Sequence, residues 1–254
     1  MQATLEVAAR FFGPGKYFDV DARGLEHVPP RPVMMVSNHS GGTTIPDVWG
    51  FIFAWYQRFG TARPIHPLAH EIIMSTRATA SFFGRRGVLR AGRGVARDVL
   101  CTWGRDLLVM PGGDLDTWRP YRERWQVRFG GRTGYVRSAL AAGVPIVPVA
   151  NAGAHETLYV LSDGQRLARA LHLHALTRAS VWPVHLSLPW GIGFGPLPHF
   201  PLPARLRYRI GEPIQPPPVD PDRPPAEETV LAIDAAVRAA ITAQLDELRR
   251  EDQA

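Results

Sequence analysis

Residues 36–47 read Val-Ser-Asn-His-Ser-Gly-Gly-Thr-Thr-Ile-Pro-Asp and join a predicted strand to a predicted helix. The apolar run before them, residues 33–36, is typical of a buried strand. The apolar run after them, residues 48–56, predicts a helix with a proline near its first position. We therefore expect His39 in a loop where a strand ends and Asp47 where the next helix begins. Such loops are where α/β proteins place their chemistry.

His39 is a candidate general base, because the ordinary pKa of histidine lies close to neutral pH. A carboxylate in contact with the ring fixes its tautomer and raises its basicity. Asp47 is the candidate partner, since it is the only carboxylate between His39 and Glu71. The alternative is a loop histidine held by a hydrogen bond, in a turn that Gly41 and Gly42 shape.

The composition limits the class of protein. The chain has 254 residues, 45% of them hydrophobic, which is enough for one core without a second domain. The single cysteine, Cys101, excludes an intrachain disulfide and a cysteine-rich metal site, and its apolar surroundings predict a buried thiol. No apolar run is long enough to span a bilayer, and the first residues lack a signal-peptide pattern.

The formal net charge is +6 and comes from arginine, since Lys16 is the only lysine. A basic surface suits anionic lipid head groups, phosphorylated ligands or nucleic acid, and a high arginine content also follows from genomic base composition. No long basic block or nucleic-acid motif occurs, so no nucleic-acid partner is expected. The motifs of zinc proteases, α/β-hydrolases and P-loop enzymes are absent, and no metal site is expected.

Predicted strands and helices alternate along the chain, which is typical of an α/β protein. We expect a single domain with a mixed, largely parallel central sheet flanked by helices. The prolines in residues 144–149 favour an edge or irregular position for that strand. Strands are expected at residues 17–20, 33–36, 63–70, 106–110, 144–149 and 205–210, with a short strand or turn at 88–91. Helices are expected at 3–12, 46–56, 72–83, 93–103, 132–142, 164–176 and 227–250.

Four segments occur in the order and approximate spacing of one family. They are Asn38-His39, Phe-Phe-Gly-Arg-Arg-Gly at 82–87, Met-Pro-Gly-Gly-Asp at 110–114, and Val-Pro-Ile-Val-Pro-Val at 144–149. Together they resemble the glycerolipid and lysophospholipid (PlsC-like) acyltransferases. The Pro-Gly-Gly form of the third segment is most similar to the diacylglycerol-acyltransferase-like branch. The resemblance divides the chain into an N-terminal amphipathic helix and lead-in (1–24), an acyltransferase-like α/β domain (25–215), and a Pro-rich linker with a C-terminal helix (216–254).

The chain departs from the family pattern at two places. The usual first segment has aspartate five positions after the histidine, but Thr44 stands there and Asp47 follows three residues later. The usual third segment contains Glu-Gly-Thr-Arg, whereas residues 112–115 read Gly-Gly-Asp-Leu. The arginines that are candidates to supply the missing positive charge are Arg85, Arg119, Arg122 and Arg132.

The resemblance implies transfer of a fatty acyl group to a hydroxyl of a glycerolipid, lysophospholipid or related lipid. The donor is acyl-CoA or acyl-carrier protein, which is a substrate of the reaction. No bound cofactor is expected. His39 is then the general base and Asp47 its orienting partner. The candidate substrate-binding residues are Asn38, Ser40, Gly41, Gly42, Arg85, Gly112, Gly113, Asp114, Arg132, His155 and Glu156.

A lipid substrate implies a cytoplasmic protein bound peripherally to the inner face of the membrane. Phe11 and Phe12 in the N-terminal helix are candidates to insert into the lipid. The aromatic residues of the helix at 46–56 either line an acyl slot or belong to the core. Two other functions stay open, an inactive lipid-binding module of the same fold and a thioester or ester hydrolase. A separation of His39 from Asp47 favours the binding module.

Overall fold

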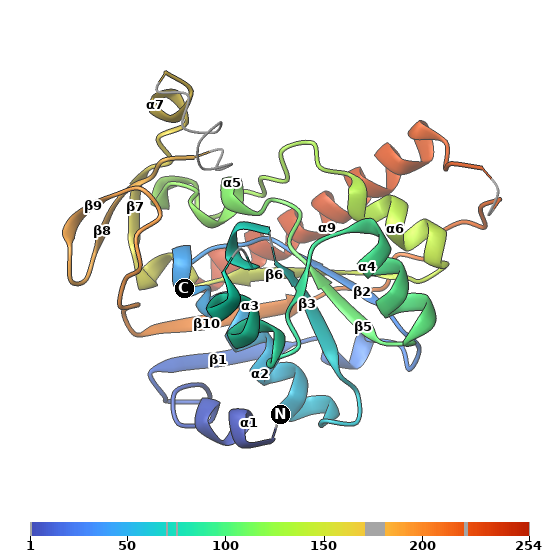
Figure 1. Ribbon diagram of the computed structural model, residues 1–254, viewed down its shortest axis with the longest axis horizontal. Coiled ribbons are helices and arrows are strands. Elements are labelled where there is room, and N and C mark those ends of the chain that lie inside the picture. The colour runs from blue at the N-terminus through green and yellow to red at the C-terminus, as the bar shows by residue number, and fades with distance from the viewer. Residues whose placement is uncertain (1, 70, 75, 171–180, 221–222, 254) are drawn as a thin grey trace.

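The computed structural model describes residues 2–69, 71–74, 76–170, 181–220 and 223–253. Its centre is a seven-stranded sheet with strand order β1-β10-β6-β2-β5-β3-β4 (Figure 1). β10 and β6 are antiparallel, and the other neighbouring pairs are parallel. The strands are β1 Phe18–Arg23, β2 Met34–Ser37, β3 Ile65–Ala69, β4 Leu89–Arg90, β5 Asp106–Val109, β6 Ile146–Ala152 and β10 Ala204–Ile210.

Helices cover both faces of this sheet, because successive residues of a strand point to opposite sides. Met34 belongs to the core on one face, beneath α6 (Gly134–Ala142) and the long helix α9 (Glu227–Gln253). Met35 belongs to the core on the other face, beneath α2 (Pro46–Phe59). The predicted mixed, largely parallel sheet flanked by helices is therefore confirmed.

A second, three-stranded antiparallel sheet lies beside the main one, with the order β7-β8-β9 (Figure 1). Its strands are β7 Tyr159–Ser162, β8 Val184–Ser187 and β9 Gly191–Phe194. A small core formed by Trp118, Leu158, Val160 and Val181 packs beneath it. The sequence analysis did not predict this sheet, because its strands are only four residues long and the segments around β8 and β9 are rich in proline and glycine.

The prediction of an edge or irregular position for residues 144–149 is wrong. β6 lies inside the sheet between β10 and β2, and all seven of its residues are buried. Pro148 is tolerated because the register between β6 and β10 ends at the pair Val149–Ile210. The missing N–H of Pro148 therefore falls outside the ladder on that side, and its carbonyl accepts a hydrogen bond from Gly211 N.

Several element boundaries differ from the prediction. The expected helix over 72–83 is a 3₁₀ turn, Glu71–Met74, followed by α3, Arg77–Gly84, and residue 75 lies outside the described part. Residue 70, the end of the expected strand 63–70, also lies outside it, as do residues 171–176 of the expected helix 164–176, whose first part is α7, Gln165–Ala170. The helix at 93–103 comprises α4, Arg93–Arg97, and a π-helical turn, Asp98–Thr102. Cys101 is exposed, not buried as expected, because this helix buries Ala96, Val99 and Leu100 instead.

The N-terminal helix is shorter than expected. α1 spans Gln2–Ala8, so Phe11 and Phe12 follow the helix instead of belonging to it. Phe12 stacks on Phe18 with ring centroids 4.8 Å apart and also contacts Phe53. Phe12 is therefore packed against the main core, whereas Phe11 is exposed.

Candidate active site

The predicted site segments meet at one edge of the main sheet. His39 follows β2, the Pro-Gly-Gly segment at 111–113 follows β5, and His155 follows β6. β2, β5 and β6 are parallel neighbours, so their carboxyl ends lie side by side. The structure thus brings together residues that are more than a hundred positions apart in the sequence.

His39 and Asp47 are in direct contact despite their unusual spacing. His39 Nδ1 lies 2.7 Å from Asp47 Oδ2, which also accepts a hydrogen bond from Ser40 N at 2.8 Å. Asp47 Oδ1 accepts from Val48 N, and the Asp47 carbonyl accepts from the buried Tyr208 hydroxyl at 2.7 Å. The Asp47 carboxylate is therefore held on several sides.

The loop between them closes because it turns sharply twice. Gly41 has a φ of 94°, and a 3₁₀ turn, Gly42–Thr44, follows it. Ile45 also adopts the left-handed conformation, with φ 44° and ψ 51°, which is rare for a β-branched residue and costs about 1–3 kcal/mol. A Cβ on Gly41 would lie 2.6 Å from Pro46 Cδ, so this close approach requires glycine. These turns accommodate the three residues by which the spacing of His39 and Asp47 exceeds the usual spacing of the family.

The surroundings of His39 favour its protonated form. Burial lowers the pKa of His39, but the negative charge and the hydrogen bond of Asp47 raise it by more than burial lowers it. The pKa of His39 therefore lies above its ordinary value. The side chain keeps 12% exposure, which leaves the ring accessible from one side. With the proton of the neutral ring on Nδ1 beside Asp47, Nε2 carries the lone pair that accepts a proton.

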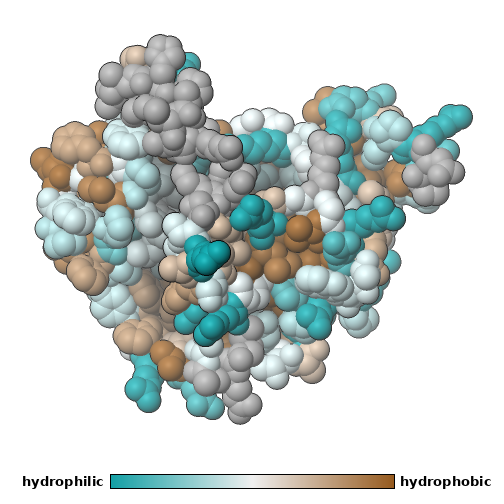
Figure 2. All heavy atoms as spheres, in the orientation of Figure 1, coloured by the Kyte–Doolittle hydropathy of each residue, from teal (hydrophilic) through white to brown (hydrophobic). Residues whose placement is uncertain are grey.

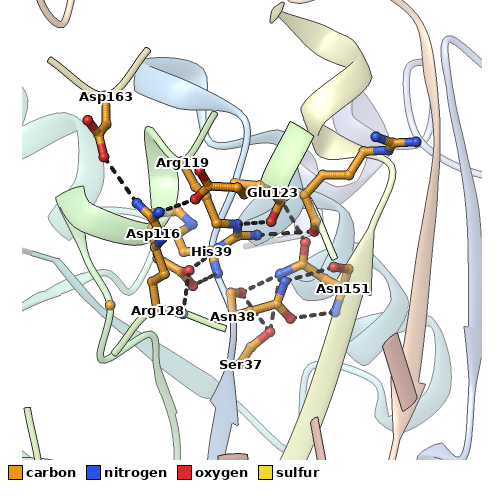
Figure 3. Close-up of polar contacts among 12 residues, drawn as sticks. Ser37, Asn38, His39, Asp116, Arg119, Glu123, Arg128, Asn151 and Asp163 are labelled. Atoms are coloured by element: carbon orange, nitrogen blue, oxygen red, sulfur yellow. Dashed lines mark hydrogen bonds and ion pairs between the residues drawn. The ribbon is translucent and has the colours of Figure 1, made fainter. Parts of the chain in front are cut away.

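A second buried carboxylate holds the backbone of His39. Asp116 Oδ2 accepts a hydrogen bond from His39 N at 2.6 Å, and Asp116 Oδ1 accepts one from Arg128 N at 3.0 Å (Figure 3). The guanidinium of Arg119, itself fully buried, forms an ion pair with Asp116. Burial raises the pKa of Asp116, while Arg119 opposes that shift. The sequence analysis missed Asp116, although it lies two residues after the Pro-Gly-Gly-Asp segment.

Asn38 joins the loop to β6. Its side chain donates to Asn151 O and accepts from Asn151 N, both at 2.8 Å (Figure 3). Ser40 Oγ donates to Asn151 Oδ1 at 3.1 Å. Asn38 and Ser40, expected to bind substrate, are fully buried, and their side chains bond within the protein. The sequence analysis did not select Asn151 as a site residue. The one signal that could have identified it is its position just after the predicted strand at 144–149.

The Pro-Gly-Gly segment is braced by Arg132. Its guanidinium donates to Gly112 O at 2.7 Å and forms an ion pair with Asp114 at 3.0 Å. A Cβ on Gly112 would lie 2.3 Å from Asp116 Cβ, so glycine is needed to pack this turn against the buried carboxylate. Gly113 N donates to Met110 O. The structure thus gives Gly113, Asp114 and Arg132 partners within the protein, and their contacts with substrate stay a prediction.

The remaining candidates lie in different environments. His155 is buried on the same rim, and burial, together with the positive charges of Arg119 and Arg124, holds its pKa well below the ordinary value. Glu156 is half-buried, and burial raises its pKa. Gly42 packs against His199, another residue that the sequence analysis did not select. Arg85 is exposed just after α3.

Comparison with known proteins gives this geometry a family. Residues 19–152, just over half of the chain, match the family described as Acyltransferase. The chain belongs to the acyltransferase family. The matched region contains His39, Asp47, Asp116 and Asn151, so these four residues of the hydrogen-bonded site all lie inside it. Among the described residues, no helix of this acyltransferase is long and apolar enough to cross a membrane.

The similar proteins define the fold more than the substrate. Uncharacterized proteins of Mycobacterium tuberculosis and Mycobacterium bovis are 27% identical over 207 residues, which cover 81% of this acyltransferase and 54% of each relative. The chain therefore spans about half the length of the curated relatives it matches. The 1-acyl-sn-glycerophosphate acyltransferase PlsC of Thermotoga maritima has a similar fold, with a TM-score of 0.53, 20% identity and coverage of 98% of this chain and 80% of that one.

Proposed function

We propose that this acyltransferase moves a fatty acyl group from a thioester, acyl-CoA or acyl-carrier protein, to a hydroxyl of a lipid acceptor, with His39 as general base. The observation that carries the proposal is the 2.7 Å contact between His39 Nδ1 and Asp47 Oδ2 in the loop that the family uses. The Pro-Gly-Gly turn supports an acceptor like that of the diacylglycerol-acyltransferase-like branch. The membrane's inner face is the proposed place of action.

The proposed reaction is one proton transfer coupled to acyl transfer. His39 Nε2 accepts the proton of the acceptor hydroxyl while its oxygen attacks the thioester carbon. A C–O bond forms, and the carbonyl oxygen becomes an oxyanion. When the oxyanion collapses, the C–S bond breaks and the proton on Nε2 passes to the leaving thiolate. Asp47 stabilises the transient imidazolium and keeps the ring in place.

The alternatives are separated by this geometry and by turnover. An inactive binding module has no need for a carboxylate in contact with the histidine, so the contact favours an enzyme. A hydrolase would use the same base on water, and only measurement with and without an acceptor distinguishes it from a transferase.

The test is incubation of the protein with labelled acyl-CoA and a lipid extract, followed by identification of the labelled product. We expect a labelled lipid in the presence of the extract, and about 10²–10⁴-fold less of it with His39→Ala, since a general base contributes that much to the rate. His27→Ala, which alters a histidine away from this loop, is the control. Free labelled fatty acid without labelled lipid would indicate a hydrolase, and near-normal turnover by folded His39→Ala would exclude the assigned base.

A further inference from the structure

The outer face of the small sheet is strongly apolar and open to solvent. Among the described residues, fourteen large hydrophobic side chains are exposed, and eight of them belong to β7, β8, β9 or the segments that join and follow them. Figure 2 shows hydrophobic side chains gathered at the left edge of the molecule, where Figure 1 places β8 and β9. The eight residues are Tyr159, Leu161, Leu186, Leu188, Trp190, Ile192, Phe194 and Phe200.

Along β8 and β9, the apolar side chains of the sheet lie on its exposed face instead of its buried one. Along β8, His185 and Ser187 are buried while Leu186 is exposed, and along β9, Gly193 is buried between the exposed Ile192 and Phe194. A half-buried strand of a soluble protein ordinarily carries polar residues on its outer face. β9 also forms an edge of the sheet, and exposed apolar edge strands are prone to unwanted pairing. This pattern indicates that the exposed face of the sheet binds a second apolar surface.

The charges favour lipid over an acidic carrier protein. Residues 158–162 and 181–203, which contain the three strands, include no Asp, Glu, Lys or Arg. An acidic protein would need cations on this surface, whereas the hydrocarbon of a membrane requires that charges be absent from it. Arg166 and Arg169, both exposed on α7 (Gln165–Ala170), follow β7 closely and are placed to meet anionic head groups.

The same segment contacts the loop of the candidate base. Thr44 Oγ1 lies 3.1 Å from His199 Nε2, and Thr43 Oγ1 donates to Leu197 O at 3.2 Å. Both threonines lie between His39 and Asp47. An apolar surface bonded to this loop would bring the site next to the membrane in which a lipid acceptor resides.

We propose that the outer face of β7–β9 is the membrane-docking surface of this acyltransferase and that its occupant is the interfacial region of a lipid leaflet. The inference rests on the proposed function for its choice of a lipid acceptor. Docking is shallow, because the unpaired backbone groups of the β9 edge need water or head groups as partners. Trp190, in the turn between β8 and β9, then lies at the level where tryptophan is favoured.

Sedimentation with vesicles tests the surface. The probe vesicles contain phosphatidylcholine and phosphatidylglycerol in equal parts, and the variant is Trp190→Ser/Ile192→Ser/Phe194→Ser. We expect it to partition about 100-fold more weakly than the wild type, since three large apolar side chains no longer leave water. The matched control, Phe82→Ser/Trp103→Ser/Leu231→Ser, removes exposed side chains of similar size elsewhere and keeps wild-type binding. Equal binding by the β9 variant, or loss of binding by the control alone, would overturn the proposal.

A second measurement covers the case in which the triple variant does not fold. Lipids brominated near the glycerol backbone should quench the fluorescence of the wild type more than that of Trp190→Phe, which keeps an apolar ring. No difference between the two proteins would overturn the proposal. The proposal would also be overturned if the wild type did not bind these vesicles at low salt. If the wild type were then a dimer in solution and the triple variant a monomer, a second copy of the chain would be what covers the sheet.

Turnover of a short-chain acyl-CoA with a water-soluble alcohol separates this proposal from the proposed function. Vesicle binding without turnover would leave the docking surface standing and refute the enzyme. Turnover without vesicle binding would support the enzyme and refute the docking surface.

Discussion

His39 and Asp47 are separated by eight positions and still form a 2.7 Å contact. Their pairing is supported by two layers of partners, with Ser40 N on the carboxylate and Asp116 on the backbone N–H of His39. At the scale of single residues, the site is therefore a histidine whose ring and main chain are each fixed by a separate buried carboxylate. Such fixation keeps the reactive nitrogen in one orientation.

Asp47→Asn should change the pH dependence as well as the rate. The base must be neutral to act, so activity falls as the pH drops below the raised pKa of His39. The amide no longer raises this pKa, so the acid limb of the kcat/KM profile should move to lower pH while the maximum falls about 10-fold or more. Asp19→Asn on β1, outside this loop, is the control. An unmoved acid limb would show that Asp47 does not set the pKa.

The charge of His39 also contributes to stability. Its folded pKa is raised, so the stabilising ion pair is fully present below the unfolded pKa of about 6.5 and is lost as the pH rises through the folded value. The candidate base therefore becomes competent over the same pH range in which this contribution disappears.

At the scale of elements, the candidate base loop is clamped between the two sheets. Asn38 ties it to β6, while Thr44 and Gly42 meet His199 in the segment after β9. Gly42 has a φ of 63°, and a Cβ there would lie 2.8 Å from His199 Cε1 and 3.1 Å from Leu158 Cδ2. The small sheet and the candidate site are thus coupled through direct packing.

Gly42→Ala tests this coupling against Gly143→Ala. Both glycines have a φ near +60°, but a Cβ on Gly143 meets nothing within 4 Å. Gly143→Ala should cost about 1 kcal/mol for the backbone alone, and Gly42→Ala about 1–3 kcal/mol more because neighbours must shift. Denaturant unfolding measures both. Equal losses of stability would mean that the loop does not pack tightly against the small sheet.

At the scale of the whole molecule, the C-terminal helix is part of the main core. α9 buries Val230, Val237, Ile241, Leu245 and Leu248 against the sheet and α6. Residues near both ends of the chain therefore stabilise one structure. The +6 net charge of the chain adds a long-range attraction to anionic surfaces, which salt screens, whereas the apolar contacts of β7–β9 do not depend on salt.

Leu245→Ala should lower the free energy of unfolding by about 2–5 kcal/mol, because Leu245 is fully buried and its loss leaves a cavity. Leu231→Ala on the same helix, at a side chain that is 52% exposed, should change it by about 0.5 kcal/mol or less. Urea unfolding of the two variants measures the difference. A small effect at Leu245 would mean that α9 is only loosely attached to the core.

The strand, loop and helix around His39, the alternation that makes an α/β sheet, and the family could all be predicted from the sequence. These follow from periodicity and turn residues, which act over a few neighbouring positions. Tertiary packing brings Asp47 to His39 and places β6 inside the sheet. Tertiary packing also brings Asn151 and Asp116 to their partners Asn38 and His39, which lie 113 and 77 residues away in the sequence. It also decided which apolar residues stay exposed on β7–β9. Such pairings depend on how distant segments pack, and local patterns do not encode that packing.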